Sequence, residues 1–344
     1  MRSTSIFKLL SASIFLSGFA GSSASGETIE FTMSLVVPPT HVIAAGQFVP
    51  WAKDIEKATE GRVKFRLLPK AVSGPAQQLD SVRQGVADVA FIAHGWTPGR
   101  FPMAKITEMP LLSSTCEVGS VAYQRIFDRY LKQRFRKASG VITIAVYTNG
   151  PAHIYNTKRP IHKVKDMEGM KFRVAAGGNA EIAKLLGVTA VPRPAPETYQ
   201  LLSSGVVEGV FLPHDGACLY KIPEAAKYAS IVPGGLFTAS VAAVMNPAKF
   251  AKLEKRDQET IMKLSGEAFA RRAGRAWDEA NAKCVRYMRK VGVKINTVGK
   301  TFRNEVRGKT ASYEQAWIKE ANKLGLNGKK MLEELRAEVR KLEK

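Results

Sequence analysis

The fold of this chain is decided by the stretch Asp166-Met167-Glu168-Gly169-Met170-Lys171-Phe172-Arg173-Val174, which runs on into the small residues Ala175-Ala176-Gly177-Gly178-Asn179. From Met170 onward apolar and basic residues alternate, and this period of two predicts a β-strand with one buried face. The glycine turn leads into residues 180–186, whose spacing predicts a short amphipathic helix. The pattern therefore places Arg173 at the carboxyl end of a strand, just before the start of a helix.

Arg173 has two interpretations at this position. Ligands of open α/β sheets bind at the carboxyl ends of strands, and a helix N-terminus attracts anions. A fixed guanidinium there can bind a carboxylate through two parallel hydrogen bonds. The alternative is an arginine that points to solvent or forms a structural salt bridge, and the stretch alone leaves both open.

Strand and helix patterns alternate on both sides of this stretch, as is typical of an α/β protein. The first part of the chain follows the order β-α-β-α-β, which predicts a parallel sheet with right-handed crossovers. A second unit begins near Pro151, and two lobes joined by several chain crossings indicate a hinged clamshell. Strands are predicted at residues 29–37, 63–68, 87–92, 141–147, 170–174, 188–192, 206–212 and 239–245, and helices at 42–59, 76–84, 118–136, 180–186, 197–204, 257–291, 301–324 and 329–341.

Residues 1–26 have the pattern of a secretory signal peptide. Arg2 and Lys8 precede a short apolar run, and small residues that suit cleavage follow it. The run is too short to span a membrane, and the first cysteine is Cys116, so no lipid attachment site follows the run. We therefore predict a soluble protein released into a bacterial periplasm. Lobe I is predicted to contain residues 27–150 and about 238–285, and lobe II residues 151–237 with about 286–344, including the C-terminal helices.

The chain has a strongly basic composition, with a formal net charge of +22. Such an excess is found in nucleic-acid-binding proteins. In residues 249–344, however, basic and acidic residues interleave on helical repeats, which is typical of solvated helix faces. We therefore predict no nucleic-acid partner and no stable membrane insertion. Attraction of anionic solutes, or of an anionic membrane surface, is the favoured interpretation.

The three cysteines Cys116, Cys218 and Cys284 are far apart in the sequence. Their odd number leaves at least one thiol without a partner in the chain. One disulfide is possible in an oxidising compartment, but the sequence does not select the pair. We expect most of them to pack as apolar side chains.

No motif for catalysis, metal binding or cofactor binding is present. The five histidines lack metal-ligand spacing. The chain has no nucleophile elbow, P-loop or dinucleotide fingerprint. His41, His94 and His214 fall in loops at predicted sheet ends, where hydrogen bonding in a polar cleft is favoured over a zinc or copper site. We therefore predict no catalytic residue, no metal and no cofactor.

Two further loop residues are candidates for ligand contact. Trp96 lies between Gly95 and Pro98, where it has little core to join, and we expect it to wall an apolar pocket. Asp215 follows a predicted strand. It suits a hydroxyl, an ammonium or a bound cation, or it caps the following helix.

The chain closely resembles the periplasmic solute-binding subunits of TRAP (tripartite ATP-independent periplasmic) transporters. The resemblance extends from Phe31 to about Val293 and depends on the order and spacing of linked motifs. These are Gly61-Arg62-Val63-Lys64-Phe65, Gly85-Val86-Ala87-Asp88-Val89-Ala90, Thr157-Lys158-Arg159-Pro160-Ile161, the stretch 166–174, Glu197-Thr198-Tyr199-Gln200-Leu201-Leu202 and Ser204-Gly205-Val206-Val207-Glu208-Gly209.

The resemblance implies two lobes, each a mixed sheet flanked by helices, with a long helix bracing both around an organic acid. Arg173 occupies the position of the arginine that pairs with the ligand carboxylate in that family. His153 stands where many members carry a second arginine, Leu212 where they carry asparagine, and Ala195 where phenylalanine is common. His153, His214 and Asp215 are therefore candidates for different ligand contacts.

We predict an extracytoplasmic receptor, not an enzyme, that delivers an organic acid to a TRAP membrane permease and acts as a monomer. The alternatives are a sensor module for a membrane signalling protein and, less favoured, a secreted enzyme. Trp96, Leu212 and Ala195 favour an aromatic or apolar monocarboxylate, whereas the histidines and Asp215 favour a hydroxy or keto acid, with or without a cation. The predicted ligand-binding residues are Arg173 (the carboxylate clamp), His153, His214, Asp215, Trp96, His41, His94, Asn179, Gln77 and Leu212.

Overall fold

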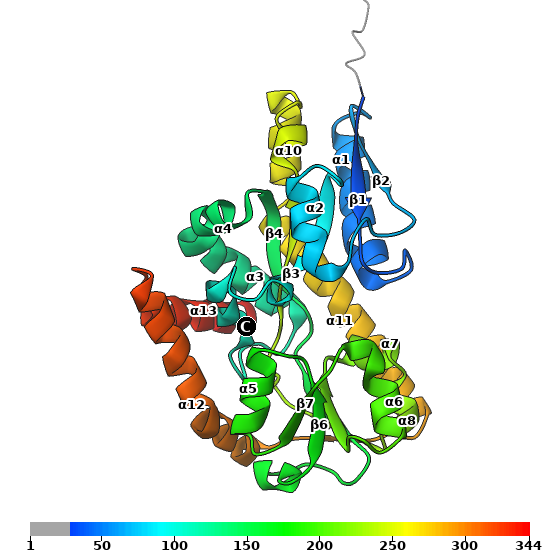
Figure 1. Cartoon of the computed structure of the whole chain (residues 1–344), viewed down its shortest axis with the longest axis vertical. Coiled ribbons are helices and arrows are strands. Elements are labelled where there is room, and N and C mark those ends of the chain that lie inside the picture. Colours follow the sequence, from blue (N-terminus) through cyan, green and yellow to red (C-terminus); the bar gives the residue numbers. More distant parts are fainter. Residues whose placement is uncertain (1–27) are drawn as a thin grey trace, which may run out of the picture.

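The computed structural model describes residues 28–344, so the predicted signal peptide lies outside the described residues. The described chain forms two lobes, each built on one sheet with helices around it (Figure 1). Both sheets are mixed, which confirms the predicted two-lobed α/β fold. The residue boundaries of the two lobes stay a prediction.

The first lobe is built on a five-stranded sheet. Its strands are β1 (Ile29–Ser34), β2 (Val63–Leu67), β3 (Val89–Ala93), β4 (Ile142–Thr148) and β10 (Ser240–Met245). They lie in the order β2-β1-β3-β10-β4. β1 pairs in parallel with β2 and β3, as the alternating pattern predicted, and β10 runs antiparallel between β3 and β4. The helical segments connected to this sheet are η1 (Ile43–Phe48), α1 (Val49–Ala58), η2 (Pro75–Gln77), α2 (Gln78–Arg83), η3 (His94–Trp96), η4 (Pro102–Glu108), α3 (Cys116–Ile126), η5 (Phe127–Leu131), α4 (Lys132–Ser139), α9 (Pro247–Phe250) and α10 (Lys255–Lys263).

The second lobe is built on a six-stranded sheet. Its strands are β5 (His153–Asn156), β6 (Lys171–Val174), β7 (Thr189–Pro192), β8 (Gly209–Leu212), β9 (Tyr228–Ile231) and β11 (Lys294–Thr297). The order is β11-β9-β5-β8-β6-β7, and β5 is antiparallel to both of its neighbours. β5, β9 and β11 were not predicted. The remaining helical segments are η6 (Val164–Met167), α5 (Gly178–Leu185), η7 (Ala195–Glu197), α6 (Thr198–Ser203), α7 (His214–Leu219), α8 (Ile222–Ala225), α11 (Glu267–Lys290), α12 (Lys300–Lys323) and α13 (Gly328–Leu342).

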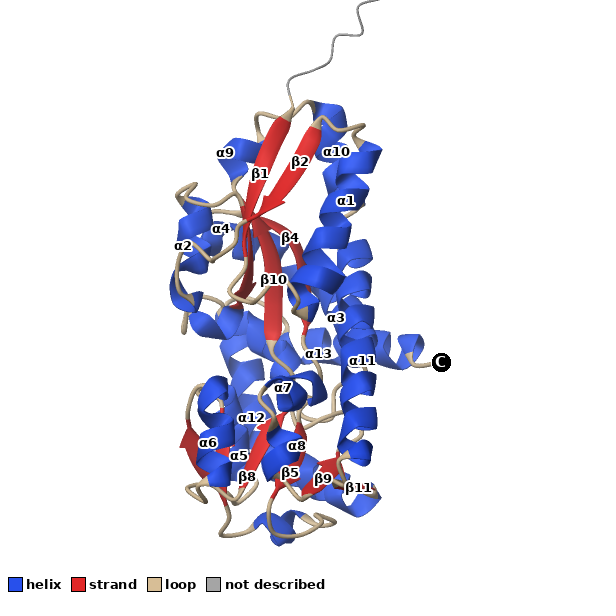
Figure 2. Ribbon diagram, turned by 90° about the vertical axis from the view of Figure 1, so that its right-hand side faces the viewer, coloured by secondary structure: helices blue, strands red, loops and turns tan. Residues whose placement is uncertain are grey.

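The helix α11 runs alongside both lobes (Figure 2). In the first lobe, its Asp278 carboxylate accepts hydrogen bonds from the backbone N–H groups of Cys116 (2.8 Å) and Glu117 (3.0 Å), which lie unpaired at the start of α3. One turn later, Asn281 Oδ1 accepts a hydrogen bond from the Asp215 N–H at 2.8 Å, and Cys284 forms a disulfide with Cys218 of α7. α11 therefore attaches α3 and α7 to each other within two turns, in agreement with the predicted bracing helix.

Two predicted helices contain a π-helical segment, and a third is interrupted. The helix predicted at 42–59 begins as a π-helix, η1, before α1, and the one at 118–136 contains the π-helix η5 between α3 and α4. A single helix over 257–291 is wrong, because α10 ends at Lys263 and α11 begins at Glu267. Gly266 between them has φ 56° and ψ −129°, a conformation that breaks a helix and favours glycine.

Gly274 allows the close contact between α11 and α3. A Cβ added at Gly274 would lie 2.4 Å from Cα of Glu117, so the two backbones touch. We expect Gly274→Ala to lower the free energy of unfolding by about 1–3 kcal/mol, because neither backbone can move aside. Gly308 is the matched control: it lies inside α12 with nothing within 4 Å of an added Cβ. Gly308→Ala should raise stability by roughly 0.5–1 kcal/mol. Urea denaturation of both variants tests this, and equal effects would contradict it.

Candidate functional site

Arg173 lies on β6 with its guanidinium held by one backbone carbonyl. The side chain is 3% exposed. Its Nε and Nη2 both donate to the carbonyl oxygen of Arg193, at 2.9 and 2.6 Å. These two bonds occupy the side of the guanidinium that carries Nε. The other edge, formed by Nη1 and the second proton of Nη2, is left for a bidentate partner such as a carboxylate.

Within the described chain, Arg173 forms no ion pair. Burial lowers the pKa of Arg173 to about 10, and only the more distant Tyr220 and Glu197 act in the opposite direction. Glu197 lies 3.9 Å from a different arginine, Arg193. A buried cation without a counter-ion is strongly unfavourable, so this arrangement is suited to an anionic ligand.

The register of the second sheet brings His153 to the same edge as Arg173. Arg173 pairs with Val210, Leu212 lies two residues further along β8, and Leu212 pairs with His153. Paired residues, and residues two apart in a strand, share one face of a sheet. Arg173 and His153 therefore lie on one face, two strand spacings apart across the sheet and two residues apart along it, which is about 12 Å between their Cα atoms.

The rings of His153 and His214 are in contact and are tilted relative to each other. Their ring centroids are 4.1 Å apart with an interplanar angle of 31°. The Val232 N–H donates to Nδ1 of His153 at 3.2 Å, and the hydroxyl of Tyr155 lies 2.5 Å from Nδ1 of His214. Burial lowers the pKa of His214 to about 4 and, together with the nearby His214, lowers that of His153 well below 6.5. Both rings are therefore neutral at pH 7.

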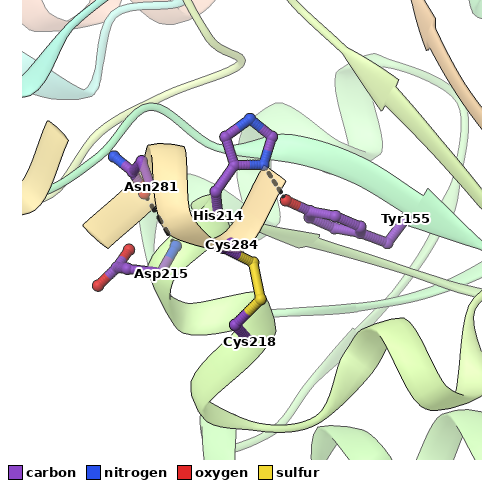
Figure 3. Close-up of a disulfide and its surroundings, with 6 residues drawn as sticks. All are labelled: Tyr155, His214, Asp215, Cys218, Asn281 and Cys284. Atoms are coloured by element: carbon purple, nitrogen blue, oxygen red, sulfur yellow. Dashed lines mark hydrogen bonds between the residues drawn. A yellow bond between two sulfur atoms is a disulfide. The ribbon is translucent and has the colours of Figure 1, made fainter. Parts of the chain in front are cut away.

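Asp215 points away from this pair. Figure 3 shows the His214 ring turned toward Tyr155 and the Asp215 carboxylate on the opposite side, next to Asn281. Its Oδ1 is sealed from solvent and forms no hydrogen bond within the described residues. Burial raises the pKa of Asp215 to about 6. The Asp215 carboxylate therefore faces α11 and not the histidine pair, and Asp215 adds no second cation to this region.

Three residues of this region were missed by the sequence analysis. Tyr220 lies near both Arg173, which lowers its pKa, and Asp215, which raises it, while burial is the main cause of its raised pKa. Tyr155 is two residues from His153 on the same strand face, so strand alternation was the signal that pointed to it. Asn281 contacts Asp215 across 66 residues of sequence, and no local pattern predicts such a contact.

The other predicted site residues occupy less distinctive positions. His41 is half-buried and accepts a hydrogen bond from the Ile43 N–H on Nδ1, at 3.2 Å. Trp96 is half-buried and packs its ring against Phe91 at 5.5 Å, so it joins the core of the first lobe in part. Gln77 is exposed, Asn179 is half-buried in the first turn of α5, and Leu212 is buried in the second lobe. A ligand role for these five stays a prediction.

His94 has the contacts of a core residue. Its Nδ1 lies 2.7 Å from Oγ of Ser240, which donates to the hydroxyl of Tyr123 at 2.9 Å. Phe101 and Phe135 pack edge-on against the ring, at 4.7 and 5.0 Å. These contacts do not support the predicted ligand role.

The disulfide between Cys218 and Cys284 lies beside this site (Figure 3). The prediction that most cysteines pack as apolar side chains is therefore wrong, because two of the three are bonded to each other. Cys116 is free and buried. The pairing brings together positions 66 residues apart, which only the folded chain reveals.

No cluster that could hold a metal ion is present in residues 28–344. A pocket of about 530 Å³ lies away from all ten predicted residues, between α12, α13 and residues 110–112. The arrangement at Arg173 offers one buried cation, two neutral imidazole rings and one carboxylate. Such a set can bind a small acid and supplies no activated nucleophile.

Acid should destabilise this protein through its buried histidines. Burial lowers the pKa of His94 to about 3 and that of His214 to about 4, from an ordinary 6.5. Their contribution to stability is complete above pH 6.5, where both states are neutral, and decreases as the pH falls toward the folded-state values, because only the unfolded chain takes up protons there. We expect a loss of about 2.5 kcal/mol per histidine at pH 4.5.

Asp215 offsets part of this loss, because its pKa is raised to about 6 and its protonation below that value relieves an unfavourable buried charge. Urea denaturation at pH 7.5 and 4.5 measures the net effect. His94→Asn, which removes one titrating ring, should flatten the pH dependence. His162→Asn, at an exposed position, is the control and should not. If His94→Asn lost as much stability between pH 7.5 and 4.5 as the wild-type protein, the role given to His94 would be contradicted.

Comparison with known proteins gives matches over most of the chain. A family model described as bacterial extracellular solute-binding protein, family 7, matches residues 33–320. The outer membrane transporter protein TsaT of Comamonas testosteroni is 28% identical over 308 residues, which cover 89% of this chain and 90% of TsaT.

Two solved structures are similar throughout. One is a TRAP periplasmic solute-binding protein from Bordetella bronchiseptica with bound (R)- and (S)-mandelate. It is 37% identical, with a TM-score of 0.84, and the match covers 91% of this chain and 99% of that one. The other is a marine metagenome TRAP solute-binding protein specific for aromatic acid ligands, in complex with 3-hydroxybenzoate. It is 27% identical, with a TM-score of 0.84, and the match covers 93% and 100% of the two chains.

Proposed function

Because this chain belongs to family 7 of the bacterial extracellular solute-binding proteins, as its motifs predicted, we propose that it binds an organic acid at Arg173 and delivers it to a TRAP membrane permease. The receptor works in the periplasm as a monomer and leaves its ligand chemically unchanged. In residues 28–344, no helix is long and apolar enough to cross a membrane.

The observation that carries this proposal is the state of Arg173. Its guanidinium is buried, lacks an ion pair within the described chain, and is held by the Arg193 carbonyl with one two-donor edge left over. A ligand carboxylate supplies both the missing charge and two acceptors for that edge. Closure of the lobes then follows from a difference in affinity between the open and closed forms.

An aromatic monocarboxylate is the ligand class that we favour. The relatives with bound mandelate and 3-hydroxybenzoate match nearly the whole chain. Trp96 and Leu212 provide apolar surface in place of polar side chains. In this proposal Arg173 is the carboxylate clamp, and His153, His214 and Tyr220 are its neighbours in the site.

Binding of mandelate, phenylacetate and benzoate to unfolded and refolded protein, which has lost any bound acid, tests the proposal. Saturating ligand stabilises a protein by RT ln(1 + [L]/Kd), so at least one acid should raise the melting temperature by several degrees and give a calorimetric signal. Mass spectrometry should recover it unchanged. Failure of all three acids would refute the aromatic class, and turnover would favour the alternative of a secreted enzyme.

A further inference from the structure

The protonation of the histidine pair is fixed by its hydrogen bonds. The Nδ1 atom of His153 accepts the Val232 N–H, so this nitrogen carries no proton and the proton of the ring lies on Nε2. The Tyr155 hydroxyl has no other hydrogen-bond partner within the described residues, so we assign it as the donor to Nδ1 of His214, which lies 2.5 Å away. Both rings are thus the neutral Nε2–H tautomer.

The Nε2–H groups are the remaining hydrogen-bond donors of the two histidines. Neither Nε2 atom forms a hydrogen bond within the described residues. Neither of them is a fully buried polar atom without a partner in residues 28–344. A proton added at Nδ1 of either ring would break the hydrogen bond there and place a charge on a ring whose centroid lies 4.1 Å from that of its neighbour. The pair therefore acts as two neutral donors at the edge of the sheet.

The buried positive charge at this edge is limited to Arg173. Among residues 28–344, Arg173 is the only lysine or arginine that is buried. The one charged residue of α7 is Asp215, so this helix supplies no second cation. One ligand carboxylate is matched by Arg173, but a second would be buried against neutral N–H donors alone.

From this balance of charge we propose that the receptor selects monoanionic acids and rejects dicarboxylates. The ligand carboxylate binds Arg173, and a neutral oxygen of the ligand, such as a hydroxyl, accepts hydrogen bonds from the Nε2–H groups of His153 and His214. This inference rests on the proposed function, because it assumes that Arg173 binds the ligand carboxylate. It assigns the two histidines as the residues that set the charge of the ligand. A second carboxylate without a cation should weaken binding by at least ~10-fold.

Calorimetry with two matched pairs of acids tests the selection. Phenylacetate and phenylmalonate differ by one carboxylate on an aromatic acid, and pentanoate and glutarate differ in the same way on an aliphatic chain. We expect the monoanion of at least one pair to bind at least ~10-fold more tightly than its dianion. Equal or tighter binding of the dianions overturns the inference and leaves the proposed function standing. Binding of none of the four acids overturns the inference, and the aromatic class proposed above fails with it only if mandelate and benzoate do not bind either.

Charge substitution at His153 gives the reverse test. His153→Arg supplies a second buried cation and should shift the preference toward the dicarboxylate of each pair by at least ~10-fold. His162→Arg adds the same charge at an exposed position and should leave the preference unchanged. An equal shift in both variants would show a general charge effect and overturn the inference.

The tautomers can be measured without any substitution. ¹⁵N NMR of the labelled imidazoles should show, between pH 6 and 8, an unprotonated Nδ1 and a protonated Nε2 for both His153 and His214. An imidazolium signal from either ring in this range would supply a second cation and overturn the inference. This readout remains valid if the buried His153→Arg variant fails to fold.

Discussion

Arg173→Ala is expected to weaken binding of the organic acid by at least ~100-fold. The ligand carboxylate would lose both its charged partner and its two-donor edge in a buried setting, where an unpaired charge is most unfavourable. Isothermal titration calorimetry with the acid that binds the wild-type protein measures the change. Arg173→Lys should also bind weakly, because an ammonium group cannot reproduce the planar two-donor edge or the bonds to Arg193.

Arg193→Ala is the matched control. Arg193 holds Arg173 through its backbone carbonyl, and its own side chain is exposed and lies 3.9 Å from Glu197. Removing that side chain keeps the carbonyl, so affinity should stay within a few-fold of wild type. If Arg173→Ala bound the acid normally, or if both variants lost affinity equally, the role of the guanidinium would be refuted.

Removal of the Cys218–Cys284 disulfide is expected to lower the free energy of unfolding by about 2–4 kcal/mol. The bond closes a loop with a sequence separation of 66 residues, and such a cross-link restricts the unfolded chain. The double variant Cys218→Ala/Cys284→Ala avoids a new free thiol, and urea denaturation measures its stability. Affinity for the acid should fall less than in Arg173→Ala, because α7 keeps the Asn281–Asp215 hydrogen bond to α11.

The free cysteine provides the control for this experiment. Dithiothreitol should destabilise the wild-type protein and Cys116→Ala alike, since both contain the disulfide. It should leave the double variant unchanged. Sensitivity of the double variant to the reductant, or wild-type stability in the double variant, would contradict the structural role of the bond.

Local sequence patterns predicted those parts of the fold that depend on local chemistry. The alternation around Arg173 gave a strand and the following helix, and the structure places β6 and α5 there. The strands β5, β9 and β11 have four residues each, as β6 does, but they lack the repeated alternation of apolar and basic residues that indicated β6. They are strands because the second sheet supplies their hydrogen-bond partners.

The candidate site, like the fold, was predicted only where it depends on the local sequence. Arg173 was found from its position at a strand end and from the family motifs. The neutral state of His153 and His214 could not be predicted, because it depends on Val232 and Tyr155, which lie 79 and 59 residues away from their partners. A histidine in a sequence carries no information on which nitrogen accepts a hydrogen bond.

The position of β10 in the first sheet has a consequence for how the protein folds. β10 lies between β3 and β4. β4 therefore cannot join the first sheet until residues 240–245, which come much later in the chain, have paired with both strands. α11, which completes the contact to α3, comes later still. Such distant pairings slow folding, since the chain entropy is lost before the contacts form. The first lobe should therefore complete its structure late, with the N-terminal half alone unable to form a stable domain.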